Sequence, residues 1–312
     1  MKLSVLVNYR CQLDAMSAVP IGQTADQEIK KVTHLVDTQN IQLADFSHIL
    51  QQQRQCIQLA FDAFEKDLSE LKSQLAQLIA DSEKPWFQES YRLYEKEMIY
   101  ETTEYILNRR PGITSETEQF YRTRIRRYNS WQHPAMIIRP GQETYINELL
   151  ASDPLYLVDE NHDLLAPAMN LFNDQYQGRL RPYTINERQD HEILAKLPNG
   201  QFGFALAYNF FNFRPFEVIR KYLTEIYQKL RPGGVLALTF NDCDRDKGVI
   251  LVEQHFCCYT PGYLVRELAQ SLGFEIVFSW TDQGPTTWLE LRKPGEFQTL
   301  RGGQALAKVI PK

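Results

Sequence analysis

The stretch YQKLRPGGVLALTF, residues 227–240, decides the fold class. Its first residues end an amphipathic helical pattern, a Pro-Gly-Gly turn follows, and Val235 to Phe240 form a nearly continuous apolar run. Such a run is typical of a strand that is buried on both faces of a parallel sheet. A helix, a tight turn and a buried strand in this order predict an α/β domain.

The same alternation of short apolar runs and helical patterns extends over about half of the chain. We expect strands at residues 136–138, 155–158, 179–185, 202–209, 235–240, 275–280 and 287–291, and helices at 145–150, 163–172, 190–197, 215–230 and 260–273. The last two strands are adjacent in the chain, so they can form an antiparallel pair at the edge of the sheet.

The stretch 227–240 resembles the turn into the fifth strand of class I S-adenosylmethionine-dependent methyltransferases. YTPGYLVRELAQSLGFEIVFSW, residues 259–280, is similar to the next helix and strand of that family. The resemblance implies a Rossmann-like domain over residues 131–292 with a mostly parallel seven-stranded sheet. It also implies S-adenosylmethionine as the cofactor and methyl transfer to an unidentified acceptor.

The cofactor of such a fold lies beyond the carboxyl ends of the strands. In LYLVDEN, residues 155–161, the resemblance matches the ribose-binding acid to Asp159, with Glu160 as the adjacent alternative. An exposed carboxylate at the end of a strand explains Asp159 equally well. After the third strand, the adenine-binding position matches Asn186 or Glu187.

The first turn, MIIRPGQET at residues 136–144, departs from the glycine-rich pattern of the family. Pro140 and Gly141 are the candidate cofactor contacts there. Arg139 and Glu143 stand where the family has glycines, and Ile138 stands at its acidic position. A side chain at a position of close approach blocks the ligand or forces another backbone path.

The end of the fourth strand, LAYNFFNFRP at residues 206–215, supplies the candidate catalytic residues. Asn209 and Tyr208 are expected to orient an acceptor, with Phe210 and Asn212 beside them. Packing at the end of the strand is the alternative for these side chains.

The loop DCDRDKGVILVE, residues 242–253, has carboxylates spaced as in a calcium-binding loop, but Lys247 stands where that loop needs glycine. We therefore expect no metal site. Asp242, Asp244, Asp246 and His255 are expected instead to line the entrance for the acceptor.

The N-terminal half differs in character. Residues 1–25 are expected to form a strand or an extended arm because apolar and polar residues alternate at its start, and residues 26–130 a long helical module. Pro85 is expected to open a separate helix that reaches about Leu107. Within residues 41–80, apolar positions follow the heptad spacing of a coiled coil: Leu43, Phe46, Leu50, Ile57, Phe61, Phe64, Leu68, Leu71, Leu75 and Leu78. This seam predicts either self-association, a protein partner, or packing on another helix of the same chain.

A helix over about 115–128 carries Arg122, Arg124, Arg126 and Arg127 between aromatic residues. Arginines interleaved with aromatics can bind nucleic acid. At this spacing they wrap around the helix, which favours solvation or pairing with acids.

Composition narrows the remaining choices. The chain has 312 residues, a net charge of −5 and five cysteines without a CxxC pair. Its first ten residues lack the longer apolar stretch and the small-residue cleavage site of a signal peptide, and no apolar run reaches membrane-spanning length. We therefore expect a cytoplasmic protein without a membrane partner, with residues 293–312 as an extended tail. The leading hypothesis is a methyltransferase. The alternative is a non-catalytic structural or assembly protein with the same fold, such as a component of a phage virion.

Overall fold

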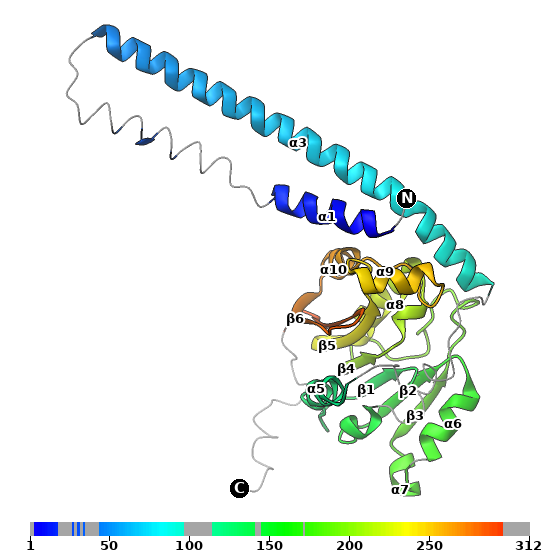
Figure 1. The fold of residues 1–312 in the computed structure, drawn as a ribbon. Helices are drawn as coiled ribbons and strands as arrows, with labels where there is room; N and C mark the ends of the chain where they lie inside the picture. The colour runs from blue at the N-terminus through cyan, green and yellow to red at the C-terminus, as the bar shows by residue number, and fades with distance from the viewer. Residues whose placement is uncertain are drawn as a thin grey trace, which may run out of the picture. The chain divides into compact units, whose positions relative to one another are not determined.

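The computed structural model describes residues 3–17, 27, 30, 31, 34, 44–96, 114–140, 145–170 and 172–295. The chain divides into two compact units, Met1–Pro85 and Trp86–Lys312 (Figure 1). The predicted boundary at residue 131 differs from this division, because the helix before the first strand contributes its side chains to the core of the sheet. Each unit is described by itself.

The predicted N-terminal strand or arm within residues 1–25 is wrong, because the chain forms helix α1 over Leu3–Ser17. Leu3, Leu6 and Arg10 are buried on one face of this helix. Their spacing of three and four residues is helical, and it outweighs the short alternation around them. The Arg10 guanidinium forms an ion pair with Glu83 within the same unit.

Helix α3 runs over Ala44–Glu95 with Pro85 inside it, so the expectation that Pro85 opens a separate helix is wrong. Packing beyond the proline offsets the lost backbone hydrogen bond. The Phe87 and Tyr259 rings lie 5.1 Å apart, and the Ser90 hydroxyl accepts a hydrogen bond of 2.8 Å from the Tyr259 amide. Residues 97–107 lie outside the described part. No described helix has an apolar stretch long enough to cross a membrane.

The second unit contains a seven-stranded sheet with the order β3-β2-β1-β4-β5-β7-β6. Neighbouring strands from β3 to β5 are parallel, and β7 pairs antiparallel with both β5 and β6. The predicted Rossmann-like, mostly parallel sheet is confirmed, as is the antiparallel pair at its edge. The strands are β1 Ala135–Ile138, β2 Leu155–Asp159, β3 Leu180–Thr184, β4 Phe202–Ala207, β5 Leu230–Asn241, β6 Glu275–Thr281 and β7 Thr286–Arg292.

Helices cover both faces of this sheet (Figure 1). In β1, Met136 and Ile138 join one core and Ala135 and Ile137 join the other, since successive side chains point to opposite faces. The first core includes residues of α8 (Phe216–Lys229) and α10 (Gly262–Ser271). The second includes residues of α5 (Ser115–Arg126), the 3-10 helix η1 (Tyr145–Leu149) and α6 (His162–Asn170). The remaining elements are α7 Asp174–Gln177, η2 Phe211–Phe213 and α9 Asp246–Glu253.

The helix predicted for residues 190–197 is wrong, because this segment forms turns. The Glu225 carboxylate on α8 accepts hydrogen bonds from the amides of Ile193, at 2.9 Å, and Leu194, at 2.6 Å. These bonds to a distant side chain take the place of bonds within a helix.

Three arginines of α5 form ion pairs with acids of the same unit. Arg122 and Arg126 both bind Glu148, at 3.0 and 2.6 Å. Arg124 binds Glu290 of β7 through two nitrogens, at 2.6 and 2.5 Å, and the fully buried Glu290 also accepts hydrogen bonds from Tyr128 and Trp288. These pairs link α5 to the sheet through Glu290 and to η1 through Glu148.

We predict that Arg124→Ala lowers the free energy of unfolding by about 3–5 kcal/mol, because it leaves the Glu290 carboxylate buried without its counter-charge. Urea unfolding measures the change. The matched control is Arg127→Ala at the exposed C-cap of the same helix, for which we expect a change below about 0.5 kcal/mol. Equal effects of the two substitutions would contradict this account of the buried pair.

Candidate functional site

The carboxyl ends of the parallel strands meet at one edge of the sheet, where an open α/β fold places its ligand. Arg139 follows β1, Asp159 ends β2 and Asn209 follows β4 closely. The predicted site residues that the structure describes lie at or near this edge. Gly141 and Glu143 lie outside the described residues.

Asp159 is 5% exposed, and its two carboxylate oxygens have different surroundings. Oδ1 accepts a 2.9 Å hydrogen bond from the Asn161 amide. Oδ2 is buried and has no hydrogen-bond partner in the described part of the chain. Burial raises the pKa of Asp159, and the Asn161 amide, Arg139 and Arg214 act in the opposite direction. A buried carboxylate oxygen without a partner is costly, and it marks a position that a hydrogen-bond donor can fill.

Glu160, the alternative to Asp159, is engaged by the protein itself. Its Oε1 accepts a 3.2 Å hydrogen bond from the Glu187 amide, and its Oε2 lies 3.3 Å from Nη2 of Arg214. Burial raises the pKa of Glu160, and the nearby charge of Glu187 adds to the effect.

Arg214 connects this carboxylate to a second one. Its Nε donates to both oxygens of Glu187, each at 3.2 Å. Glu187 also accepts hydrogen bonds from the hydroxyls of Tyr222, at 2.7 Å, and Tyr94. Glu187, Arg214 and Glu160 therefore form a network that joins the segments after β2 and β3 to α8 and the end of α3.

Asn186 is exposed and stabilises a turn. Its Oδ1 accepts a 3.1 Å hydrogen bond from the Gln189 amide, and its own amide donates to Asp190 at 3.0 Å. Its neighbour Glu187, the other residue matched to the adenine-binding position, is the buried one.

The first turn keeps one backbone property of a glycine turn. Arg139 has φ 55°, the left-handed region that favours glycine, and its amide continues the sheet by donating to the Val158 carbonyl at 2.7 Å. This conformation costs an arginine about 1–3 kcal/mol. The guanidinium carbon lies 6.0 Å from the Phe210 ring centre, and Pro140 is buried. A side chain therefore stands in the turn after β1, at a position where the sequence resemblance predicts a glycine.

Tyr208 belongs to the core. Its ring lies 5.4 Å from that of Tyr121 and 4.9 Å from that of Tyr145, and the residue is 2% exposed. These contacts fit the alternative expectation, that Tyr208 packs at the end of the strand and does not orient an acceptor.

Asn209 differs from Tyr208 because part of its side chain is unused. It has φ 53°, and its amide donates to the Thr239 hydroxyl at 2.8 Å. Its Oδ1 accepts a 3.2 Å hydrogen bond from Nδ2 of Asn212. Asn209 Nδ2 and Asn212 Oδ1 are both buried without a hydrogen-bond partner among the described residues. The pair therefore offers one donor and one acceptor to a ligand.

The acidic loop after β5 has a structural role. Asp242 is 2% exposed, so it does not line an entrance, and its carboxylate accepts hydrogen bonds from the Thr287 hydroxyl, at 2.7 Å, and the Asp244 amide, at 3.0 Å. Asp244 in turn accepts from the Tyr263 amide at 2.7 Å. Helix α9 begins at Asp246. Among the residues that the structure describes, no three His, Cys, Asp or Glu side chains are grouped to hold a metal ion.

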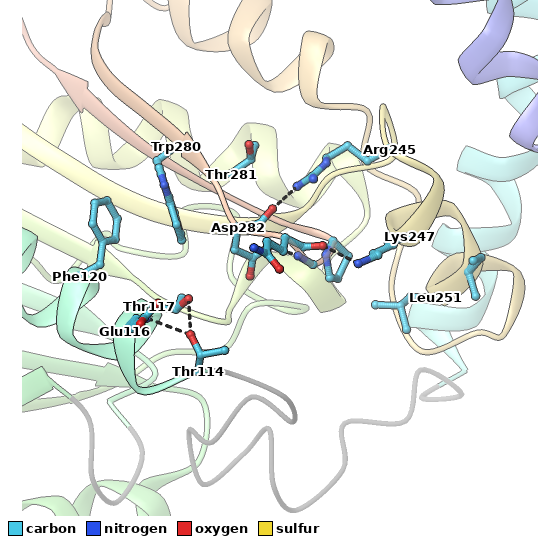
Figure 2. Close-up of a pocket in the computed structure, with 14 residues that line it drawn as sticks. Thr114, Glu116, Thr117, Phe120, Arg245, Lys247, Leu251, Trp280, Thr281 and Asp282 are labelled. Atoms are coloured by element: carbon cyan, nitrogen blue, oxygen red, sulfur yellow. Dashed lines mark hydrogen bonds between the residues drawn. The ribbon is translucent and has the colours of Figure 1, made fainter.

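A hollow of about 1120 Å³ lies near the carboxyl end of β5, between the start of α5, α9 and the turn from β6 to β7 (Figure 2). Phe120 and Trp280 form an aromatic wall, with ring centres 4.3 Å apart. Opposite them, Arg245 donates to the Asp282 carbonyl at 2.8 Å and Lys247 to the Gln283 carbonyl at 2.6 Å. Both cations therefore support the β6–β7 turn.

Sequence reasoning missed Arg214 and Tyr94. One signal for Arg214 was present, since three acids near the ends of adjacent strands, Asp159, Glu160 and Glu187, require a positive counter-charge when they are buried. Tyr94 had no such signal, because it reaches Glu187 from a helix 93 residues earlier in the chain.

No protein-family model and no curated protein matches this chain. Solved structures similar to it include the N-methyltransferase NodS from Bradyrhizobium japonicum WM9 in complex with S-adenosyl-L-homocysteine, at 13% identity and a TM-score of 0.45 over 66% of this chain and 99% of that one. A SAM-dependent methyltransferase from Aquifex aeolicus has 13% identity and a TM-score of 0.42 over 64% and 96%. The [4+2]-cyclase SpnF has 14% identity and a TM-score of 0.44 over 59% and 84%. The fold assignment itself rests on the strand order and register.

We predict that Asp159→Asn stabilises the protein at pH 7.5. A raised pKa means that stability from this group is present below the ordinary Asp pKa and is lost as the pH rises through the folded-state value. At pH 7.5, which is above the ordinary Asp pKa, burial of this carboxyl is therefore a cost that the uncharged amide avoids, so the melting temperature should rise by about 2–4 °C.

The gain from Asp159→Asn should shrink as the pH is lowered towards 4, because the wild-type carboxyl then takes up its proton. Asp163→Asn, at an exposed position in the first turn of α6, is the matched control and should not raise the melting temperature, because an acid there is favoured by the helix dipole. A lower melting temperature for Asp159→Asn at pH 7.5 would show that its charge stabilises the fold.

Proposed function

We propose that this protein is an S-adenosylmethionine-dependent methyltransferase that holds its cofactor at the carboxyl edge of β1, β2 and β4. The observation that carries the proposal is the buried Asp159 Oδ2 without a hydrogen-bond partner in the described part of the chain. An acid at the end of the second strand of this fold accepts hydrogen bonds from ribose hydroxyls. Since Glu160 is bound by Arg214, Asp159 is the acid we assign to the ribose.

The charges at this edge support a cationic ligand. Asp159, Glu160 and Glu187 carry three negative charges when ionised, against two positive charges on Arg139 and Arg214. S-adenosylmethionine has a positively charged sulfonium and, when bound, supplies an electrophilic methyl group. Pro140 and Gly141 remain the proposed contacts at the first turn.

Asn209 is the residue we assign to the methyl acceptor. Its Nδ2 donor and the Oδ1 acceptor of Asn212 can orient an acceptor that carries an N–H beside a carbonyl or ring nitrogen, such as an amide or a nucleobase-like group. Transfer in line with the leaving sulfur depends mainly on this orientation. Tyr208, which is packed in the core, is not part of the proposed chemistry.

A second candidate function is favoured by one specific observation, the Arg139 side chain at the position of a close-approach glycine. In that case the protein is a non-catalytic structural or assembly protein, as a component of a phage particle would be. Fold alone does not separate the two functions.

Calorimetric titration of the full-length protein with S-adenosylhomocysteine tests the proposal. We expect the wild type to bind. Asp159→Asn should weaken binding by about 10- to 100-fold, because it removes a hydrogen bond between the ligand and a charged group. The variant should therefore be both more stable and a weaker binder, which is expected of a residue retained for ligand binding.

Asp163→Asn should bind as the wild type does. If neither S-adenosylhomocysteine nor S-adenosylmethionine binds a wild-type protein that melts cooperatively, the methyltransferase proposal is wrong and the non-catalytic function stands. Equal affinity of wild type and Asp159→Asn would contradict the assignment of Asp159 to the ribose.

A further inference from the structure

Helix α3 presents an apolar seam with the spacing of a coiled coil. Between residues 57 and 78 the steps alternate between four and three residues through Ile57, Phe61, Phe64, Leu68, Leu71, Leu75 and Leu78. Three of these side chains lie seven residues apart and are about half exposed: Phe64 at 54%, Leu71 at 52% and Leu78 at 47%. The other four are also not fully buried.

The exposure of this row separates two explanations of the heptad pattern. If the seam packed on another helix of the same chain, Phe64, Leu71 and Leu78 would be buried by it. Within the described residues of this unit, 3–17, 27, 30, 31, 34 and 44–85, no helix buries them, and they are accessible to water at regular intervals. Aligned, exposed large apolar side chains mark an interaction surface. The upstream part of the predicted seam, at Leu43, Phe46 and Leu50, lies outside the residues or side chains that the structure describes.

We propose that residues 57–78 of α3 form a two-stranded coiled coil with a second copy of this chain. In the heptad notation, position a holds Phe61, Leu68 and Leu75, and position d holds Ile57, Phe64, Leu71 and Leu78. The seam covers three heptads, the shortest length for which the pattern argues a coiled coil. A second copy of this helix has apolar side chains at the same intervals, so its a and d side chains can pack into the holes between those of the first copy.

Charges beside the seam are complementary between two copies. Position e holds Glu65 and Lys72, and position g holds Asp67. In a parallel pair Lys72 faces Asp67 of the second copy, and in an antiparallel pair it faces Glu65 of the second copy. Neither arrangement brings two like charges together at these positions. Self-association is therefore favoured at the flanks as well as along the apolar row.

The test is the mass of the full-length protein in solution by light scattering and sedimentation. We expect a dimer for the wild type. Leu71→Glu, at the centre of the seam, should raise the dissociation constant by about 100-fold or more, because each dimer loses two buried leucines. The matched control is Leu59→Glu on the same helix at position f, away from the seam, where the leucine is 62% exposed. This control should remain a dimer.

A charge exchange tests the flanks independently of the apolar row. Lys72→Glu should weaken the dimer by about 2- to 10-fold. Addition of Asp67→Lys should restore it if the helices are parallel, and addition of Glu65→Lys should restore it if they are antiparallel. Circular dichroism checks that each variant keeps its helix content. A monomeric wild type, a dimer that survives Leu71→Glu, or loss of the dimer in Leu59→Glu would overturn the proposal.

Discussion

The carboxyl edge of the sheet holds three acidic side chains within a small, mostly buried region, and Arg214 pairs with two of them. Its guanidinium bonds Glu187 through one nitrogen and Glu160 through another. Because Glu187 also binds Tyr222 and Tyr94, the same ion pairs join the strand ends to the helices around them. Asp159 shares this region without a direct bond to a guanidinium, which leaves it available to a ligand.

This arrangement of charges links the architecture to the proposed chemistry. A buried acid whose pKa is raised costs stability when it is ionised, and Asp159 has this property at the position where the fold predicts a ligand contact. The left-handed conformation of Arg139 is a second cost at the same edge. Costs that gather at one edge of an otherwise well-packed sheet are typical of a functional site.

The sheet was predictable because each buried strand is a short apolar run, and the position of Asp159 at the end of β2 was predictable because it directly follows one such run. Contacts between distant residues were not. The pairing of Arg214 with Glu187 spans 27 residues, and although three buried acids require a positive counter-charge, no local pattern indicates which arginine supplies it. The turns at residues 190–197 have helical spacing but take their hydrogen bonds from Glu225. At the N-terminus, a few alternating residues suggested a strand, whereas the burial of Leu3 and Leu6 belongs to a helix.

The pair between Arg124 and Glu290 also bears on the order in which the chain can fold. The two residues are 166 positions apart, and β7 lies between β5 and β6 instead of at the edge. During synthesis, α5 and the first five strands emerge while the place beside β5 is still vacant and Arg124 lacks its acid. The hairpin of β6 and β7 must then pair with β5 through β7 and bring Glu290 into the core, so native closure of this domain depends on contacts of long sequence separation.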